Sequence, residues 1–388
     1  MRRSSCIARR RSKTAGWSAS LRSKDKQVAY EKLAQPLTLT RGPSWKNRFM
    51  LAPLTNQQSH DDGTLSDDEY NWLVARAKGG FGMVMTAAAH VQRVGQGFVG
   101  QIGAFADEHL DGLSRLADGI RENGAVSSVQ LHHAGSRSDK AVVAHPVSAS
   151  DVEAAGARGL STDEVQRLRD DFVAAAVRAE KAGFDGVEVH GAHGYILAEF
   201  LSPEINRRED RYGGSPENRA RLVLEIIDGI RASCGAQFQL GLRVSPERFG
   251  QKLLEIRSLI ADVMAGGKLD YVDLSLWDVR KVANDPEGEG RPLIDWFMDL
   301  PRGGTQLGVA GKIFGADDCA WALEKGCNFV AIGRGAILRH DFPKRVLADA
   351  EYTSPPLPVT EQHLIDEALS PTFVHYMKNW KGFVAEPA

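Results

Sequence analysis

Cysteines are scarce in this chain, and their spacing matches no common metal-binding pattern. The 388 residues include four cysteines, Cys6, Cys234, Cys319 and Cys327, and no two of them form a C-x-x-C pair. Iron–sulfur clusters and structural zinc sites are commonly built from such pairs, so we expect neither. Isolated cysteines are typical of reduced thiols, which favours a cytoplasmic protein.

Long apolar runs and a strong net charge are also absent. No stretch approaches the ~20 consecutive apolar residues that a membrane-spanning helix needs. The formal net charge of -2 gives no general attraction to nucleic acid. We therefore expect neither a membrane nor a nucleic acid as a partner. With 43% hydrophobic residues, the chain can still bury a large core.

The first 36 residues differ in composition from the rest. They are rich in arginine, lysine and serine, and no acidic residue precedes Asp25. This composition is typical of organelle transit peptides, but a disordered basic tail or a start site placed too far upstream explains it equally. We expect residues 1–36 to form a disordered basic extension, with organelle import as the alternative, and folding to begin near Leu37.

Strand-like apolar runs alternate with helical patterns along most of the chain. The expected strands are Phe49–Leu54, Gly82–Ala88, Val126–His132, Gly186–His190, Phe238–Val244, Tyr271–Leu276, Leu307–Ile313 and Phe329–Ile332. The expected helices are Asp67–Lys78, Glu108–Glu122, Thr162–Lys181, Pro216–Ser233, Lys252–Ala265, Pro292–Leu300, Ala316–Lys325 and Phe342–Ala350. Eight strand–helix units predict an α/β fold, a closed parallel (β/α)8 or TIM barrel over residues 37–350, with inserted loops at its C-terminal face.

A linker and a helical tail follow the expected barrel in residues 351–388. Tyr352–Pro358 is rich in proline, and Glu361–Leu369 with Phe373–Val384 has a helical pattern rich in Phe, Tyr and Trp. Such a tail would pack on the barrel or on a neighbouring subunit. The second arrangement would make the protein a homo-oligomer.

Residues with chemical potential gather where the expected strands end, the edge at which barrels of this type carry chemistry. The fourth strand leads into His190, His193 and Tyr195, two imidazoles and a phenol. Gln130 offers an amide donor and acceptor for a ring with an N–C=O edge, and the apolar strand around Arg243 demands a partner for its charge. Small or glycine-rich turns surround them at Ala52-Pro53-Leu54-Thr55, Ala87, Gly311 and Gly333-Arg334. Glycine-rich turns after the last two strands commonly hold phosphate, so a flat phosphorylated ligand fits.

Simpler interpretations exist for several of these residues. Thr55 could cap a turn, Gln130 could be a satisfied core amide, and Gly333 could serve packing alone. His190 and His193 could bind zinc, but no third ligand is evident at the other strand ends, so we expect no metal. The gathering of all these groups at one rim favours the ligand site.

The chain resembles the Old Yellow Enzyme family of flavin oxidoreductases, also called ene-reductases, from about Leu37 to Val384. Its motifs are Ala52-Pro53-Leu54-Thr55-Asn56, Val129-Gln130-Leu131-His132-His133-Ala134-Gly135, His190-Gly191-Ala192-His193-Gly194-Tyr195, Phe200-Leu201-Ser202-Pro203-Glu204-Ile205-Asn206, Asp210-Arg211-Tyr212-Gly213-Gly214-Ser215 and Ile332-Gly333-Arg334. The resemblance implies an FMN enzyme that takes hydride from NADPH or NADH. It would reduce the activated C=C bond of small-molecule α,β-unsaturated carbonyl or nitro compounds.

The resemblance also implies a role for each residue at the rim. Ala52, Pro53, Leu54, Thr55 and Ala87 would contact FMN, and Gln130 would bond the pyrimidine edge of its ring. Arg243 would support negative charge near N1, and Gly311, Gly333 and Arg334 would hold the phosphate. His190 and His193 would bind the substrate oxygen, and Tyr195 would supply the proton; these three would be the catalytic and substrate-binding residues.

Two alternatives remain at the level of the sequence. Lys312 at the end of the seventh strand could form a Schiff base, as in an aldolase-type barrel that needs no flavin. The chain could also bind flavin without useful turnover. An absorbance spectrum, borohydride trapping and reoxidation by an enone would separate these functions.

Overall fold

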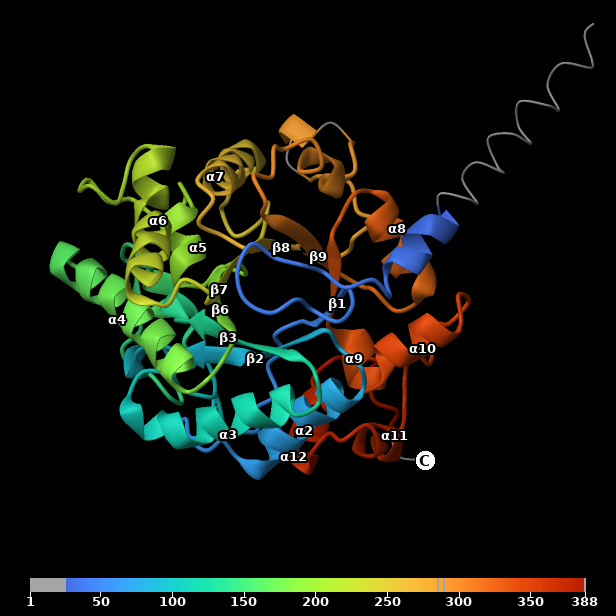
Figure 1. The fold of residues 1–388 in the computed structure, drawn as a ribbon. Coiled ribbons are helices and arrows are strands. Elements are labelled where there is room, and N and C mark those ends of the chain that lie inside the picture. Colours follow the sequence, from blue (N-terminus) through green and yellow to red (C-terminus); the bar gives the residue numbers. More distant parts are fainter. Residues whose placement is uncertain (1–25, 285, 289, 387–388) are drawn as a thin grey trace, which may run out of the picture.

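The structure is a computed structural model that describes residues 26–284, 286–288 and 290–386. Eight parallel strands close into a barrel in the order β1-β10-β9-β8-β7-β6-β3-β2, as Figure 1 shows. The strands are β1 (Phe49–Leu51), β2 (Met83–His90), β3 (Val126–His132), β6 (Gly186–Gly191), β7 (Gln239–Val244), β8 (Tyr271–Ser275), β9 (Gln306–Ala310) and β10 (Phe329–Ile332). The predicted TIM barrel is confirmed, and a small parallel pair, β4 (Val147–Ser148) with β5 (Arg158–Gly159), is added to it.

Helices surround the barrel on the outside (Figure 1). Those of the barrel region are α2 (Asp67–Lys78), α3 (Leu110–Arg121), α4 (Thr162–Lys181), α5 (Ile196–Leu201), α6 (Pro216–Ser233), α7 (Leu253–Ala265), α8 (Ala316–Glu324), α9 (Arg334–Leu338) and α10 (Phe342–Ala348). Local sequence signals explain where several begin. Ser161 and Glu164 form a capping box at the start of α4, and the side chain of Ser215 caps α6 just before Pro216.

The predicted helix Pro292–Leu300 was wrong. The segment contains one 3-10 turn, Leu293–Trp296, and then an irregular stretch. Pro292 and Pro301 bracket fewer than three turns, so the local sequence gives a helix there little support of its own. Burial of Leu293, Ile294 and Phe297 holds the segment in place instead.

The predicted start of the fold at Leu37 was too late. Residues 26–32 are helical, Leu33 has no exposed surface, and the hydroxyl of Tyr30 donates to the carbonyl of Val346 at 2.7 Å. The apolar residues of this segment, not its basic composition, decide where packing begins. The basic residues 1–25 lie outside the described part of the chain.

Large side chains fill the amino-terminal end of the barrel. Trp45 lies across this end, with its ring centroid 5.6 Å from Tyr271 and 5.0 Å from Phe329. Gly241 and Gly308 make room for these rings, because a Cβ atom at either position would collide with Tyr271 or Phe329. The apolar plug leaves the carboxyl end of the barrel for polar residues.

The C-terminal tail packs on the barrel. It contains α11 (Glu361–Asp366) and α12 (Pro371–Lys378), shorter than the predicted Glu361–Leu369 and Phe373–Val384. The buried ring of Phe373 meets Trp72 of α2 edge to face at 5.4 Å, and α12 lies beside α2 in Figure 1. This docking brings the end of α12 to the rim of the barrel.

Candidate active site

A cavity of about 420 Å³ opens at the carboxyl end of the barrel, a size common for small-molecule sites. Ten of the predicted site residues line it: Ala52, Pro53, Leu54, Thr55, His193, Tyr195, Arg243, Gly311, Gly333 and Arg334. They come from strand ends that are far apart in the sequence. The barrel brings them together because all its strands point the same way.

A tight turn after β6 gathers His190, His193 and Tyr195. His193 and Gly194 have φ values of +63° and +73°, so two successive left-handed residues turn the chain back toward the barrel axis. The ring of His190 lies 5.0 Å from that of His193 and 5.4 Å from that of Tyr195, centroid to centroid. The predicted cluster of two imidazoles and a phenol is therefore present as one group.

Burial keeps all three side chains uncharged near neutral pH. It lowers the pKa of His190 well below its usual value and that of His193 to about 3, with neighbouring arginines adding to the effect for His193. Burial likewise raises the pKa of the Tyr195 phenol, against the opposing influence of Arg137. Nε2 of His193 lies 2.7 Å from Oγ of Ser275, which fixes the ring. The cluster can thus donate hydrogen bonds and hold a phenolic proton.

A buried polar array lies inside the barrel below this cluster. Nε2 of Gln130 donates to Oε1 of Glu188 at 2.8 Å, and Nε of Arg243 lies 3.0 Å from Oδ2 of Asp273. Asp273 is the partner that the buried charge of Arg243 required, and it lies opposite Arg243 in the register of β7 and β8. These contacts hold Gln130 and Arg243 in fixed orientations.

The two carboxyl groups of this array share a single buried cation. Burial raises the pKa of Glu188 to about 8, with the charge of Asp273 adding to the rise and that of Arg243 opposing it. Burial also raises the pKa of Asp273, while Arg243 opposes that rise. We conclude that Glu188 is protonated near pH 7 and that Asp273 is the carboxylate paired with Arg243.

Two glycines shape the opposite end of the cavity. A Cβ atom at Gly311 would lie 2.8 Å from the backbone nitrogen of Asp278, so packing requires glycine there. At Gly333 a Cβ atom would meet only Leu54, at 3.6 Å, so packing alone does not explain this glycine. Lys312 and Arg334 add positive charge beside these turns. This end suits a phosphate group.

Three predicted site residues, Ala87, Gln130 and His190, are buried and do not line the cavity. A β-bulge between Met85 and Ala88 changes the pleat of β2, so that Ala88 pairs with the inward-facing Gln130. The methyl group of Ala87 consequently packs in the apolar layer outside the barrel. The expectation that Ala87 contacts FMN therefore falls to its backbone and stays a prediction.

Several cavity residues escaped the sequence analysis. They are Arg137, Arg248, Phe249, Trp277, Tyr376 and Trp380. His132 also belongs to the cluster, since its ring centroid lies 4.5 Å from that of Tyr195. The aromatic composition of the tail was a signal for Tyr376 and Trp380, but only the docking of α12 reveals where they lie.

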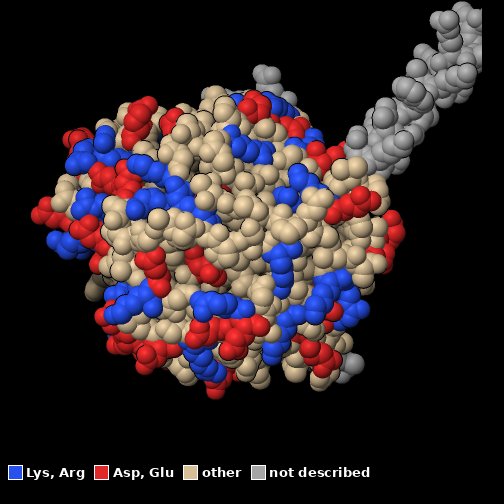
Figure 2. Space-filling model, viewed as in Figure 1, with Lys and Arg blue, Asp and Glu red and all other residues tan. Residues whose placement is uncertain are grey.

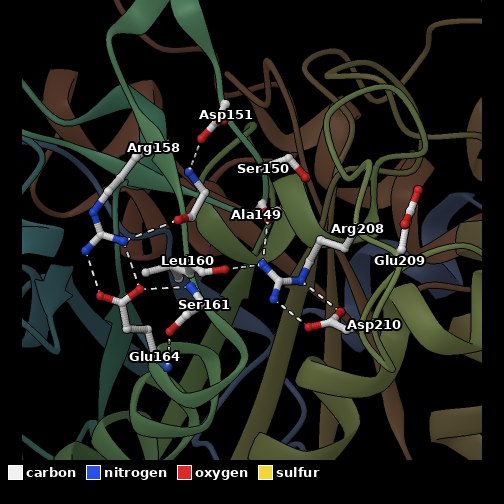
Figure 3. A pocket seen from close by; sticks show the side chains of 11 residues that line it. Ala149, Ser150, Asp151, Arg158, Leu160, Ser161, Glu164, Arg208, Glu209 and Asp210 are labelled. Carbon is white, nitrogen blue, oxygen red and sulfur yellow. Dashed lines mark hydrogen bonds and ion pairs between the residues drawn. The ribbon is translucent and has the colours of Figure 1, made fainter.

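A second hollow of about 470 Å³ lies at the surface between residues 149–164 and 208–210 (Figure 3). Both of its arginines already have carboxylate partners. Arg158 pairs with Glu164 at 2.6 Å, and Nε of Arg208 donates to Asp210 at 3.0 Å. Although this hollow is larger, its cations are already paired, so the barrel cavity remains the candidate active site.

The zinc and Schiff-base alternatives find little support. In the described part of the chain no three His, Cys, Asp or Glu side chains are placed to hold a metal ion. Lys312 is 45% exposed and pairs with Asp278 at 3.1 Å, whereas a Schiff-base lysine is usually desolvated.

Two properties of the outer surface bear on the expected partners. None of the helices among the described residues is long and apolar enough to span a bilayer. On the face drawn in Figure 2, positive and negative side chains are interspersed.

Residues 32–351 match the model of a family described as the NADH:flavin oxidoreductase / NADH oxidase family. The chain belongs to this family. It is an oxidoreductase of the Old Yellow Enzyme type, with FMN as its cofactor and NADH or NADPH as reductant.

Three family members illustrate the similarity. The "Probable NADH-dependent flavin oxidoreductase YqiG" of Bacillus subtilis (strain 168) is 36% identical over 82% of this chain and 88% of its own length. The NADH:fumarate oxidoreductase of Klebsiella pneumoniae (strain 342) is 32% identical over 83% of this chain, which spans 36% of that longer enzyme. The structure of the Old Yellow Enzyme homologue from Zymomonas mobilis has a TM-score of 0.74 and 25% identity, covering 89% of this chain and 99% of that one.

Proposed function

We propose that this chain is an ene-reductase, which uses NADH or NADPH to reduce the activated C=C bond of α,β-unsaturated carbonyl or nitro compounds. The observation that carries the proposal is the cluster of two neutral imidazoles and a protonated phenol, with His193 and Tyr195 on the wall of the cavity. The name of the fumarate oxidoreductase supports an acceptor of this kind, since fumarate is an activated alkene.

The cavity fits FMN by its shape and by its donors. Gly311, Gly333 and Arg334 would hold the phosphate, and Ala52 to Thr55 would line the ring. Gln130 would bond the pyrimidine edge while Glu188 fixes its amide, and Arg243 would face the same edge from its pair with Asp273. Bound FMN would supply the hydride for the reaction.

His193 on the cavity wall, together with His190, whose ring lies 5.0 Å behind it, would bind the oxygen of the substrate. Hydride addition to the β-carbon of an enone builds negative charge on that oxygen, so donors aimed at it stabilise the transition state more than the ground state. Neutral imidazoles suit this task, because each can present an N–H without bringing a competing charge. The contact of His193 with Ser275 would keep the ring in place as charge develops.

Tyr195 would then donate a proton to the α-carbon. Its raised pKa keeps the phenol protonated over the whole neutral range, which is the state that a general acid needs. Arg137, whose guanidinium carbon lies 5.5 Å from the Tyr195 ring centroid and whose charge opposes the rise in the pKa of the phenol, would stabilise the phenolate left behind. The proposed roles thus separate oxygen binding by the histidines from proton delivery by Tyr195.

Rapid-mixing measurement of the two half-reactions tests this assignment. Tyr195→Phe should slow oxidation of the reduced enzyme by cyclohexenone by ~10²–10⁴-fold, the worth of a general acid, yet leave reduction by NAD(P)H nearly unchanged. Nitroalkenes, whose products can leave as nitronates, should be affected less. Equal slowing of both half-reactions would mean that Tyr195 only shapes the cavity. Absence of any enone or nitroalkene turnover in the wild type would leave a flavin-binding protein and overturn the proposal.

A further inference from the structure

Two arginines stand at the mouth of the cavity on loops that follow β3 and β7. The guanidinium carbon of Arg137 lies 5.5 Å from the ring centroid of Tyr195 and 5.8 Å from that of Phe249. That of Arg248 lies 5.4 Å from Phe249 and 5.1 Å from the exposed ring of Trp277. Both arginines line the cavity and both are exposed. They form a layer of alternating guanidinium and aromatic groups.

Neither arginine forms an ion pair with a carboxylate of the described residues. Three other cations of the cavity do: Arg243 pairs with Asp273, Lys281 with Glu247 and Lys312 with Asp278. A guanidinium stacked on a ring uses its face for that contact and keeps N–H donors at its edge. Those donors match the two oxygens of a carboxylate or a phosphate.

The backbone holds Arg248 in a conformation that is energetically unfavourable for an arginine. Arg248 and Phe249 have φ values of +78° and +54°, a region that side chains other than those of Gly, Asn and Asp rarely adopt. The loop is tied down by a backbone bond from Gln251 to Arg248 at 2.9 Å and by Ser202, whose hydroxyl donates to Gly250 at 3.0 Å. Strained residues kept by their surroundings often mark binding sites.

We propose that Arg137 and Arg248 form a carboxylate subsite, so that this enzyme favours aromatic α,β-unsaturated substrates that carry a second, anionic group. The inference rests on the proposed function, since the activating oxygen is taken to lie at His190 and His193. Phe249 lies against both guanidinium groups, and Trp277 extends the aromatic wall beside Arg248. The subsite would select among the alkenes that the histidine pair can activate.

The phosphates of NAD(P)H offer the same chemistry as a carboxylate and are the other source of an anion. Arg137 decides between them, because its guanidinium carbon lies 5.5 Å from the ring centroid of Tyr195, at the reacting end of the cavity. A ribose separates the phosphates of a nicotinamide nucleotide from the ring that reacts. A carboxylate on a short aromatic alkene reaches this position more directly, so we assign the subsite to the substrate.

The test compares 4-carboxy-β-nitrostyrene with its methyl ester in the FMN-loaded enzyme. The ratio of kcat/KM for the acid to that for the ester should exceed one in the wild type. It should fall ~10-fold or more in Arg137→Met and in Arg248→Asn, because each loses a charged hydrogen bond. Asparagine tolerates the left-handed backbone at position 248.

Taking the ratio cancels any general effect of a substitution on turnover. Arg115→Met removes an arginine stacked on Tyr70 of α2, away from the cavity, and should leave the ratio unchanged.

A binding measurement gives a readout that does not depend on turnover. The saturated products of both nitrostyrenes are titrated calorimetrically into the oxidised enzyme, and only the acid should bind ~10-fold more weakly to the two cavity variants. Added salt should weaken acid binding in the wild type. The subsite would be overturned if the acid-to-ester ratio of kcat/KM were the same in all variants. It would also be overturned if the two cavity variants bound only NAD(P)H more weakly. If neither nitrostyrene is reduced, the proposed function fails, and calorimetry still decides the subsite.

Discussion

The side-chain amide of Gln130 donates to Oε1 of Glu188 at 2.8 Å, between register partners on the neighbouring strands β3 and β6. Both side chains are almost completely buried. An amide that bonds a neighbour through one N–H can turn only if that bond breaks. Glu188 therefore fixes the direction in which Gln130 presents its other polar groups. It touches neither cavity nor substrate and acts as a positioning residue.

Glu188→Gln should flatten the pH dependence of stability. The pKa of Glu188 is raised in the folded chain, so its contribution is fully present below about pH 4.5 and is lost as pH rises through about 8. Over this interval the free energy of unfolding should fall by up to ~1.4 kcal/mol per pH unit from this group alone. Chemical unfolding at several pH values checks this. Parallel profiles for the wild type and the variant would show that Glu188 does not titrate in the folded protein.

Arg243→Met should destabilise the fold more than the loss of one hydrogen bond does. Removing the guanidinium leaves Asp273 buried without a counter-charge, which costs ~3–5 kcal/mol. The double variant Arg243→Met, Asp273→Asn should regain part of that loss, because the orphaned carboxylate is gone. Both variants should retain less FMN on gel filtration. Strictly additive effects in the double-mutant cycle would argue against the pair.

Acid should destabilise the protein through its buried histidines. Burial lowers the pKa of His132, His133, His190 and His193, whereas unfolded histidines titrate near ~6.5. The unfolded chain thus takes up more protons, and stability is lost as pH falls below about 6.5. His133→Asn keeps an acceptor for the backbone N–H of Gly135 but cannot titrate. Its free energy of unfolding should therefore fall less than that of the wild type between about pH 7 and 5. Denaturant midpoints at the two pH values decide this.

The strands and the polar groups at their ends could be predicted from the sequence, because parallel strands are buried on both faces and read as apolar runs. Once eight such runs were located, the meeting of His190, Tyr195 and Arg243 at one rim followed from barrel geometry. The seventh expected strand, Leu307–Ile313, ends earlier, at Ala310, where Gly311 begins a bend.

Contacts between distant segments could not be predicted. Asp273 and Glu188 are single carboxylates inside apolar strands, and only the register of β7 with β8 and of β3 with β6 shows which cation or amide each meets. The bulge in β2 turns Ala87 outward, and no glycine or proline at this point of the sequence indicates it. Arg137 and Arg248 lie on loops, where no periodicity indicates direction.

The histidine pair should matter for the acceptor more than for the flavin. Replacing both His190 and His193 by Ala should leave FMN bound, yet slow oxidation of the reduced enzyme by cyclohexenone by several orders of magnitude, since one lost donor is worth ~10²–10³ in rate. Ser275→Ala, which only frees the ring of His193, should cost less than either histidine. Stopped-flow absorbance measures each step. A double variant that loses FMN along with activity would place the histidines in cofactor binding instead.

The docked tail should contribute to substrate binding rather than to the stability of the barrel. Phe373→Ala removes the ring that meets Trp72, and a buried Phe→Ala change costs ~3–5 kcal/mol where the surroundings stay in place. We expect the tail to detach before the barrel is destabilised by that full amount. Detachment would move Tyr376 and Trp380 away from the cavity. Limited trypsin digestion should then cut at Lys378 or Lys381, while the thermal transition of the barrel shifts little.

The KM for aromatic acceptors should rise in Phe373→Ala and in Trp380→Ala, but only the former should expose the tail to trypsin. A single cooperative transition lowered by the full cost, with no early cleavage, would show instead that tail and barrel unfold as one unit.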